Sequence, residues 1–347
     1  MWHGMTMRAF ALAAGLAGLL LGAPLAAQPA GSFADWLAAY RAGAIARGLE
    51  PQWLDQALAG LEPQLRVVEL DRAQPDAPGR AVLASYLARQ LTDERIATGR
   101  ARAAERAALL RRLEREHGVP GEVLVAIWGM ETSYGRVMGG FDILRALATL
   151  AWDGRRAELF TRELDAAVQM VGQGKVDRAS FRGSWAGAFG HPQFLPSSYL
   201  RFAIDGDGDG RADIMGNPAD ALASIANYLK QNGWSAGVPW GLRVAPPPGF
   251  DAAAVANPEQ PTRCIRPMQA HSRFLPAREW RARGFQALGG AWPADDVELS
   301  FVQPDGPGTA AFLATRNYRA IMAYNCSNFY ALSVALLGDA LRAPSGA

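Results

Sequence analysis

Apolar side chains recur every three or four positions through most of the chain, which is the spacing of one buried face of an α-helix. In the first such segment Phe33, Trp36 and Tyr40 share a face. Ser32 stands before them and is a residue type that caps helices. With glycine and proline as stop and start signals, the pattern predicts helices over 33–47, 51–58, 80–91, 92–117, 118–135, 141–150, 155–170, 218–232 and 328–341.

The helical spacing gives way to a different pattern between residues 240 and 318. Here Val297, Leu299 and Phe301 alternate with polar residues, as in a half-buried strand. A turn rich in proline and glycine follows, and residues 311–314 can pair back to form a hairpin. We therefore predict a small β-containing module in a chain that is otherwise helical.

The most apolar of the predicted helices carries one acid on its apolar surface, Glu131. It follows Ile127 by four positions and Trp128 by three, so it shares their buried face. A carboxylate in such a place needs a partner, or it holds its proton up to a higher pH. A proton held near neutrality is what a general acid requires. The alternative is a structural ion pair with Arg136 or Arg145.

Composition and charge limit the classes of protein to consider. The 347 residues are 50% hydrophobic and 20% charged, as in a globular protein, and the net charge of +2 gives no reason to expect nucleic acid. Arg8 precedes an apolar run over 9–22, and Ala27 ends a group of small residues. These features predict a signal peptide over 1–27 and a soluble, exported protein. An uncleaved membrane anchor is the alternative.

The chain has two cysteines, Cys264 and Cys326. In an exported protein an even number of cysteines favours a disulfide, here one that would tie the β-containing module to the final helix. Two buried thiols remain the alternative.

A short acidic segment has the spacing of a calcium-binding loop. Its carboxylates occupy positions 1, 3, 5 and 9 and belong to Asp205, Asp207, Asp209 and Asp213. Gly210 stands at position 6, where the loop turns sharply. Gly216 replaces the usual glutamate at position 12, so the closing ligand must come from elsewhere, and Asp220 is the nearest acid downstream. A plain aspartate–glycine turn is the alternative reading.

Polar and aromatic residues suited to binding sugars are scattered through the second half of the chain. Several fall in residues 184–199, a stretch rich in glycine, serine and proline that predicts an ordered loop. Each of them is equally compatible with a place in the core, and spacing alone does not bring them together. The candidates are Trp185, Gln193, Tyr199, Tyr228, Tyr324, Asn325 and Tyr330.

The sequence resembles the lytic murein transglycosylase B family. The resemblance rests on five segments in the family's order, covering most of the predicted mature chain. They are Gly129-Met-Glu-Thr-Ser-Tyr-Gly-Arg-Val-Met-Gly139 with residues 144–150, then 183–199, 205–213, Ala226-Asn-Tyr228 and 324–330.

The resemblance implies a mainly α (α+β) fold with a lysozyme-like helical core, an additional α domain and a small β domain. The domains implied are 28–117, the core with its calcium loop over 118–239, the β domain over 240–318 and a C-terminal helix within 319–347. It also implies cleavage of the β-1,4 bond between MurNAc and GlcNAc in peptidoglycan without water, which leaves 1,6-anhydro-MurNAc ends.

The resemblance further assigns roles to particular residues. Glu131 becomes the acid/base. The residues that contact substrate become Tyr86, Ser184, Gln193, Tyr228, Tyr324, Asn325 and Tyr330. The calcium ligands become Asp205, Asp207, Asp209, the carbonyl of Arg211 and Asp220. Asp207 stands where relatives can carry a hydroxyl, and Asp213 is not expected to bind the ion directly.

Many glycosidases need a second carboxylate. Asp142 and Asp153 are the candidates, but aspartates of this kind are more often caps or turn residues. A mechanism with one acid therefore fits better, in which Glu131 gives a proton to the leaving sugar and then takes one from the MurNAc 6-hydroxyl, assisted by the N-acetyl group.

Other readings of the sequence stay open. One is a muramidase that hydrolyses the same bond, and another is a non-catalytic peptidoglycan-binding protein. A calcium-dependent adhesion module fits poorly because the chain has one such loop and no repeats. We expect no catalytic cofactor, a structural Ca²⁺, a periplasmic location, and peptidoglycan strands and cell-wall synthesis proteins as partners.

Overall fold

The computed structural model describes residues 31–74, 82–258 and 261–342, so the predicted signal peptide lies outside the described residues. The helices are α1 (Phe33–Ala46), α2 (Pro51–Leu58), α3 (Leu65–Arg72), α4 (Leu83–Gln90), α5 (Asp93–Glu105), α6 (Ala107–His117), α7 (Gly121–Thr132), α8 (Ile143–Asp153), α9 (Ala157–Gly172), α10 (Pro196–Phe202), α11 (Pro218–Gln231), α12 (Ile265–Met268), α13 (Ala277–Ala282), α14 (Arg316–Tyr324) and α15 (Asn328–Arg342), with a 3-10 turn η1 (Ala252–Val255). The strands are β1 (Phe141–Asp142), β2 (Arg182–Gly183), β3 (Gly241–Ala245), β4 (His271–Pro276), β5 (Gln286–Ala287), β6 (Glu298–Val302) and β7 (Ala311–Ala314).

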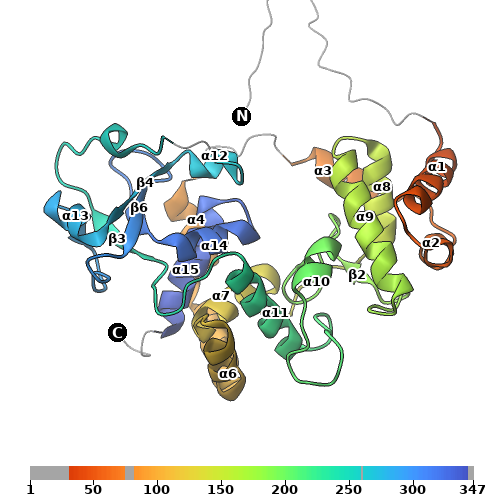
Figure 1. The fold of residues 1–347 in the computed structure, drawn as a ribbon, viewed down its shortest axis with the longest axis horizontal. Helices are drawn as coiled ribbons and strands as arrows, with labels where there is room; N and C mark the ends of the chain where they lie inside the picture. Colours follow the sequence, from red (N-terminus) through yellow and green to blue (C-terminus); the bar gives the residue numbers. More distant parts are fainter. Residues whose placement is uncertain (1–30, 75–81, 259–260, 343–347) are drawn as a thin grey trace, which may run out of the picture.

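The helices form two groups. The five-stranded sheet lies apart from the group that contains α8 and α9. In Figure 1, α1, α2 and α3 lie with α8 and α9 on the right, and they pack on these two helices. In the centre α7 packs against α5, α11 and α15. Strands β3, β4 and β6 lie on the left, beyond α15. Helices early in the chain are therefore divided between the two groups.

Helix α7 lies in the centre of the protein because most of its residues are apolar. All but three of its twelve residues are buried, from Gly121 to Thr132. A helix that is apolar all round belongs in a core rather than on a surface. Gly129 is part of this packing because a Cβ there would lie 2.6 Å from the ring of Tyr134. The prediction of a buried helix carrying Glu131 is confirmed.

Helix starts were predicted well where a capping side chain marks them. Each of the following residues accepts a hydrogen bond from a backbone N–H in the first turn of its helix: Ser32, Thr92, Asp142 and Asn217. These bonds satisfy N–H groups that lack a partner within the helix. The signal is local, so it can be read from the sequence.

Two predicted elements are wrong in part. The helix expected over 92–117 breaks at Arg106, which separates α5 from α6 and whose guanidinium lies 5.0 Å from the Trp128 ring centroid. The bend lets α5 pack on α7 while α6 also packs on α11. The loop expected over 184–199 ends earlier, because Pro196 begins α10. Helices α3 and α14 were not predicted.

The larger sheet is antiparallel with strand order β4-β6-β7-β3-β5. The predicted hairpin is confirmed, since Phe301 of β6 pairs with Leu313 of β7. The expectation of a half-buried strand is wrong. Leu299 and Phe301 face the core of the sheet, while Ser300 and Val302 on the other face are also buried, with Val302 in the main helical core. Strand β6 is thus covered on both faces.

A Cys264–Cys326 disulfide joins the start of α12 to the corner between α14 and α15, so this prediction is confirmed. Within the described ranges, no single helix is long and apolar enough to cross a membrane. Helices α14 and α15 meet the length and composition criteria only as a pair, bent by 114°.

Candidate active site

Glu131 lies in the last turn of α7, at the end of a buried apolar surface. Ile127 and Trp128 beneath it are 0% and 2% exposed, while Glu131 itself keeps a partial opening to solvent. Burial disfavours the charged carboxylate and raises its pKa to about 7, against an ordinary value of 4.5. A carboxyl group in this state can give up or accept a proton near neutral pH.

The partner of Glu131 is a tyrosine. The hydroxyl of Tyr330, in the first turn of α15, donates a hydrogen bond of 2.5 Å to Glu131 Oε1, and this bond opposes the rise in pKa. The two arginines considered as ion-pair partners are engaged elsewhere: Arg136 lies 3.4 Å from Glu94, and Arg145 donates to the carbonyls of residues 62 and 63. Among the described residues, Glu131 therefore has no ion-pair partner.

Three tyrosines form a row that leads to Glu131. The rings of Tyr324 and Tyr330 stack with centroids 6.4 Å apart, and Tyr228 meets Tyr324 edge to face at 4.8 Å. The Tyr324 hydroxyl donates to the carbonyl of Pro192, and the Tyr228 hydroxyl donates to that of Ala323, each at 2.5 Å. These bonds fix the rings, so the structure brings together residues that spacing could not.

Tyr86 of α4 also belongs to this neighbourhood. Its ring packs against that of Phe329 with centroids 5.5 Å apart. Burial and the nearby Glu131 carboxylate raise the pKa of the Tyr86 phenol. A hydroxyl contributed from the N-terminal part of the chain therefore lies near the carboxyl group.

Three further predicted residues, Ser184, Gln193 and Asn325, lie on loops, whereas Tyr199 is buried in α10. Gln193 adopts a left-handed backbone conformation (φ 49°), and its Nε2 donates to the carbonyls of Met138 and Gly190. The Ser184 hydroxyl accepts from the backbone N–H of Ala188 at 3.0 Å. Asn325 is exposed and ends α14. Gln193 is joined to the loop that follows Glu131. Among the described residues, no hydrogen bond ties Ser184 or Asn325 to the carboxyl group.

Sequence reasoning missed Thr132 and His191, which shape the turn after Glu131. The Thr132 hydroxyl donates to the carbonyl of His191 and accepts from the N–H of Gly135. Trp128 Nε1 donates to His191 Nδ1 at 3.0 Å. The only signal in the sequence is the position of Thr132 beside the acid. Both residues hold the α7 end in place.

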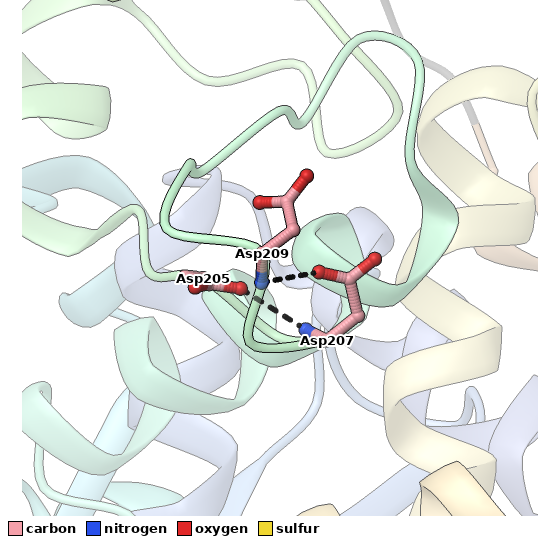
Figure 2. Close-up of side chains that lie close together, drawn as sticks. All are labelled: Asp205, Asp207 and Asp209. Atoms are coloured by element: carbon pink, nitrogen blue, oxygen red, sulfur yellow. Dashed lines mark hydrogen bonds between the residues drawn. The ribbon is translucent and has the colours of Figure 1, made fainter.

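The acidic loop brings three carboxylates together, as Figure 2 shows. One oxygen from each of Asp205, Asp207 and Asp209 lies within 4.8 Å of the others. The backbone folds around them: Asp205 accepts from the N–H groups of Gly208 and Gly210 at 2.6 and 2.7 Å. Carboxylate oxygens are the ligands that Ca²⁺ prefers, and adjacent like charges favour a cation between them, so this donor set fits calcium.

Asp220 has a different place from the one expected. It is fully buried and its two oxygens accept from the N–H groups of Gly206 and Asp213, at 2.8 and 2.7 Å. It stands outside the three-carboxylate cluster and holds both ends of the loop on the first turn of α11. The Asp213 carboxylate accepts from the N–H groups of Met215 and Gly216 and also stands outside the three-carboxylate cluster.

The two candidates for a second catalytic acid are structural. Asp142 caps α8 and lies 2.8 Å from Arg178, and Asp153 is buried 2.5 Å from Arg72. Each of the two carboxylates is thus engaged by an arginine. Neither contributes to the surroundings that set the pKa of Glu131.

The fold and the site define a class of protein. The fold is mainly α with a lysozyme-like helical core and a small antiparallel sheet, so the predicted fold class is confirmed. In the site, the Glu131 carboxyl group meets a row of tyrosines. The chain belongs to the transglycosylase SLT domain family, whose sequence profile matches residues 32–339. The resemblance to lytic murein transglycosylase B found in the sequence is thereby also confirmed.

Three relatives illustrate the similarity. Membrane-bound lytic murein transglycosylase B of Escherichia coli is 36% identical over 236 residues, which are 67% of this chain and 60% of that protein's length. SltB3 of Pseudomonas aeruginosa, solved with NAG-anhNAM-pentapeptide, is 41% identical with a TM-score of 0.80, over 89% of this chain and 79% of that one. The Escherichia coli lytic transglycosylase Slt35, solved with calcium, is 29% identical with a TM-score of 0.73, over 90% and 95% of the two chains.

Proposed function

We propose that this protein is a lytic transglycosylase that cleaves the β-1,4 bond between MurNAc and GlcNAc in peptidoglycan and leaves 1,6-anhydro-MurNAc ends. The observation that carries the proposal is the buried Glu131 carboxyl, whose pKa is raised to about 7 and which has a tyrosine rather than an arginine as its partner. Relatives of the family are named for this activity, and one was solved with an anhydro sugar peptide.

The proposed mechanism uses Glu131 twice. The neutral carboxyl first donates its proton to the oxygen that leaves with GlcNAc, as the bond from that oxygen to MurNAc C1 breaks. The MurNAc N-acetyl oxygen stabilises the positive charge at C1. The Glu131 carboxylate then removes the proton from the MurNAc 6-hydroxyl, whose oxygen bonds to C1. The carboxyl group ends the cycle protonated, as it began.

The apolar surroundings support both steps. A neutral carboxyl in a site of low polarity is a ready proton donor, and the carboxylate left there is a stronger base than one in water. The Tyr330 hydroxyl can stabilise the charged form between the steps through the bond it already makes. The ion pairs of Asp142 and Asp153 argue for a mechanism with one acid.

The substrate-binding residues remain proposals. Tyrosine rings and hydroxyls suit sugars because the ring covers an apolar face of the sugar and the hydroxyl bonds to its edge. We assign this role to Tyr86, Ser184, Gln193, Tyr228, Tyr324, Asn325 and Tyr330. Asn325 is on an exposed corner beside Tyr324, a position that suits contact with a sugar.

The products of the reaction test the proposal. Purified peptidoglycan sacculi digested with the protein should release fragments whose MurNAc ends are anhydro sugars, about 18 mass units lighter than hydrolysed ends because no water is added. Mass spectrometry of the fragments measures this. Ordinary reducing ends would instead establish a muramidase, and binding without any cleavage would establish a non-catalytic protein.

We also propose that a structural Ca²⁺ binds at Asp205, Asp207, Asp209 and the carbonyl of Arg211. The ion would offset the repulsion between the three carboxylates and tie the loop to α11. Asp220 would assist by fixing the loop ends through its bonds to Gly206 and Asp213. No catalytic step is assigned to the ion.

Removal of calcium should lower stability and leave the chemistry in place. With Ca²⁺ at about 100 times its dissociation constant, binding adds about 2.7 kcal/mol to the free energy of unfolding. Thermal unfolding with and without a chelator measures the shift, which should vanish in Asp207→Asn/Asp209→Asn. Asp296→Asn, at an exposed acid away from the loop, is the matched control and should keep it. A chelator-insensitive wild type would contradict the assignment.

The predicted location and partners complete the proposal. A signal peptide over residues 1–27 would deliver a soluble protein to the periplasm, where peptidoglycan strands are its substrate. Cell-wall synthesis proteins are candidate partners. No catalytic cofactor and no nucleic acid are needed by this mechanism.

A further inference from the structure

A pocket rich in arginine lies beside the candidate active site. Its volume is about 550 Å³, and its lining includes Arg89, Arg95, Arg102 and Arg136, with Glu94 as its single acid. Four guanidinium groups against one carboxylate give this pocket a net positive charge. We call it the arginine pocket. Sugars whose MurNAc lactyl groups are in amide linkage to a peptide carry no charge that would explain a positive pocket.

The pocket adjoins Glu131 along the chain and in space. Residues 133–136 of its lining form the turn that follows Glu131 directly. Arg95 Nη1 lies 3.7 Å from the sulfur of Met130, the residue before the acid. The charge of Glu131 raises the pKa of the Tyr86 phenol and the charges of Arg89 and Arg95 lower it, so all three groups lie near this phenol. The pocket therefore lies at the same end of α7 as Glu131.

The walls of the pocket are fixed before any ligand arrives. Arg95 Nη1 donates to the main-chain and side-chain oxygens of Gln90 at 2.7 and 2.5 Å. The Tyr134 hydroxyl donates to the carbonyl of Arg95 at 2.8 Å and so ties the turn to α5. Ser133 and Tyr134 both have positive φ, 50° and 63°, which non-glycine residues adopt at a cost. A rigid arrangement of this kind reduces the entropy lost on binding.

Two of the four arginines have donors available to a ligand. Arg89 is exposed and makes no hydrogen bond or ion pair with the described residues. Arg136 has Glu94 as a partner at 3.4 Å, but both side chains are more than 70% exposed. An exposed pair of this length contributes little to stability, so an incoming carboxylate can replace it. Arg102 is held by Glu105 at 2.9 Å, outside the pocket lining.

We propose that the arginine pocket binds carboxylate groups of the peptide attached to MurNAc. This inference rests on the proposed function and names a second part of its substrate. A guanidinium presents two parallel N–H groups that match a carboxylate, and Arg89 and Arg136 supply two such groups. A pentapeptide carries at least its terminal carboxylate, and a relative of this chain was solved with a sugar bearing one. The pocket would thus favour strands that keep their peptides.

Binding of reaction products tests this without requiring turnover. The probes are GlcNAc-anhydroMurNAc-pentapeptide and the same disaccharide with its lactyl carboxyl capped as an uncharged methylamide, each titrated by calorimetry. Wild type should bind the peptide form more tightly. Arg89→Gln/Arg136→Gln should weaken binding of the peptide form about tenfold, in line with the loss of charge-assisted hydrogen bonds, and should change binding of the capped disaccharide much less.

The control is Arg111→Gln, which removes an exposed arginine of α6 outside the pocket lining and should bind both probes as wild type does. Thermal unfolding of all three proteins shows whether the folds match. Equal binding of the two probes by wild type, or equal loss for both in the double variant, would overturn the inference. If peptide-dependent binding holds while sacculi yield no anhydro ends, the arginine pocket stands and the lytic assignment fails.

Discussion

Replacement of Glu131 by glutamine should reduce lysis of peptidoglycan by about 10³-fold or more, because the one group that donates and accepts the proton is lost. Glutamine has nearly the same shape and keeps an oxygen for the Tyr330 hydroxyl, so the variant protein should still bind glycan strands. Turnover of purified sacculi and sedimentation with them measure the two properties separately. Activity within tenfold of wild type would remove Glu131 from its role.

The same variant has a second, independent consequence for stability. The pKa of Glu131 is about 7 when folded and 4.5 ordinarily, so between these values the native state holds a proton that the unfolded chain has released. The free energy of unfolding of wild type should therefore fall as pH rises from 4.5 to 7, by up to about 3 kcal/mol, and then level off. Glu131→Gln lacks this titration, and denaturant unfolding at pH 5 and pH 8 compares the two proteins.

Glu122 offers a matched control on the same helix. It stands in the first turn of α7, at the opposite end from Glu131, and pairs with Arg342 at 3.1 Å near the surface. Glu122→Gln should leave lysis within about twofold of wild type and should cost less than about 1 kcal/mol, as expected for a surface pair. A large loss of lysis in this control would point to the stability of α7 rather than to proton transfer.

Removal of the Cys264–Cys326 disulfide should be the most damaging change away from the carboxyl group. The bridge closes a loop with a sequence separation of 62, and the loss of that constraint on the unfolded chain corresponds to about 4 kcal/mol. Cys264→Ala/Cys326→Ala should lower the denaturation midpoint accordingly. Lysis should also fall, because Cys326 lies between Tyr324 and Tyr330 and anchors the corner that positions both rings.

A reductant distinguishes the bridge from simple loss of side chains. Wild type treated with dithiothreitol should lose stability toward the level of the double variant, and the double variant should not respond. The loss of stability should be largest at the corner between α14 and α15, because the bridge joins this corner to the start of α12. Equal stability of oxidised wild type and double variant would show that the closed loop contributes nothing.

Local signals account for what was predictable. The cap at Ser32, the breaks at Gly118 and Pro120, and the run of apolar residues in α7 lie within a few residues of the features they determine. The acidic loop is similar, because alternate aspartates around glycines fold on themselves through their own backbone N–H groups. A sequence read over short windows is sufficient for such elements.

Long-range packing decided what was missed. At the bend, the Arg106 guanidinium packs on the ring of Trp128. The residues near Arg106 in the sequence give no sign of this contact. Strand β6 is covered on its second face by the helical core, which alternation along the strand cannot reveal. Asp220 serves as a brace of the loop because burial on α11 directs its oxygens to Gly206 and Asp213.

Local sequence signals were enough to predict a mainly helical protein, an acid on the apolar face of a helix, and aspartates that converge in a turn. Each of these follows from neighbours in the chain. The pKa of Glu131 and its tyrosine partner were decided only by the tertiary structure, since Tyr330 lies 199 residues away and the apolar enclosure is built from several helices. Proton affinity depends on the surroundings of a group in space, which residue spacing does not specify.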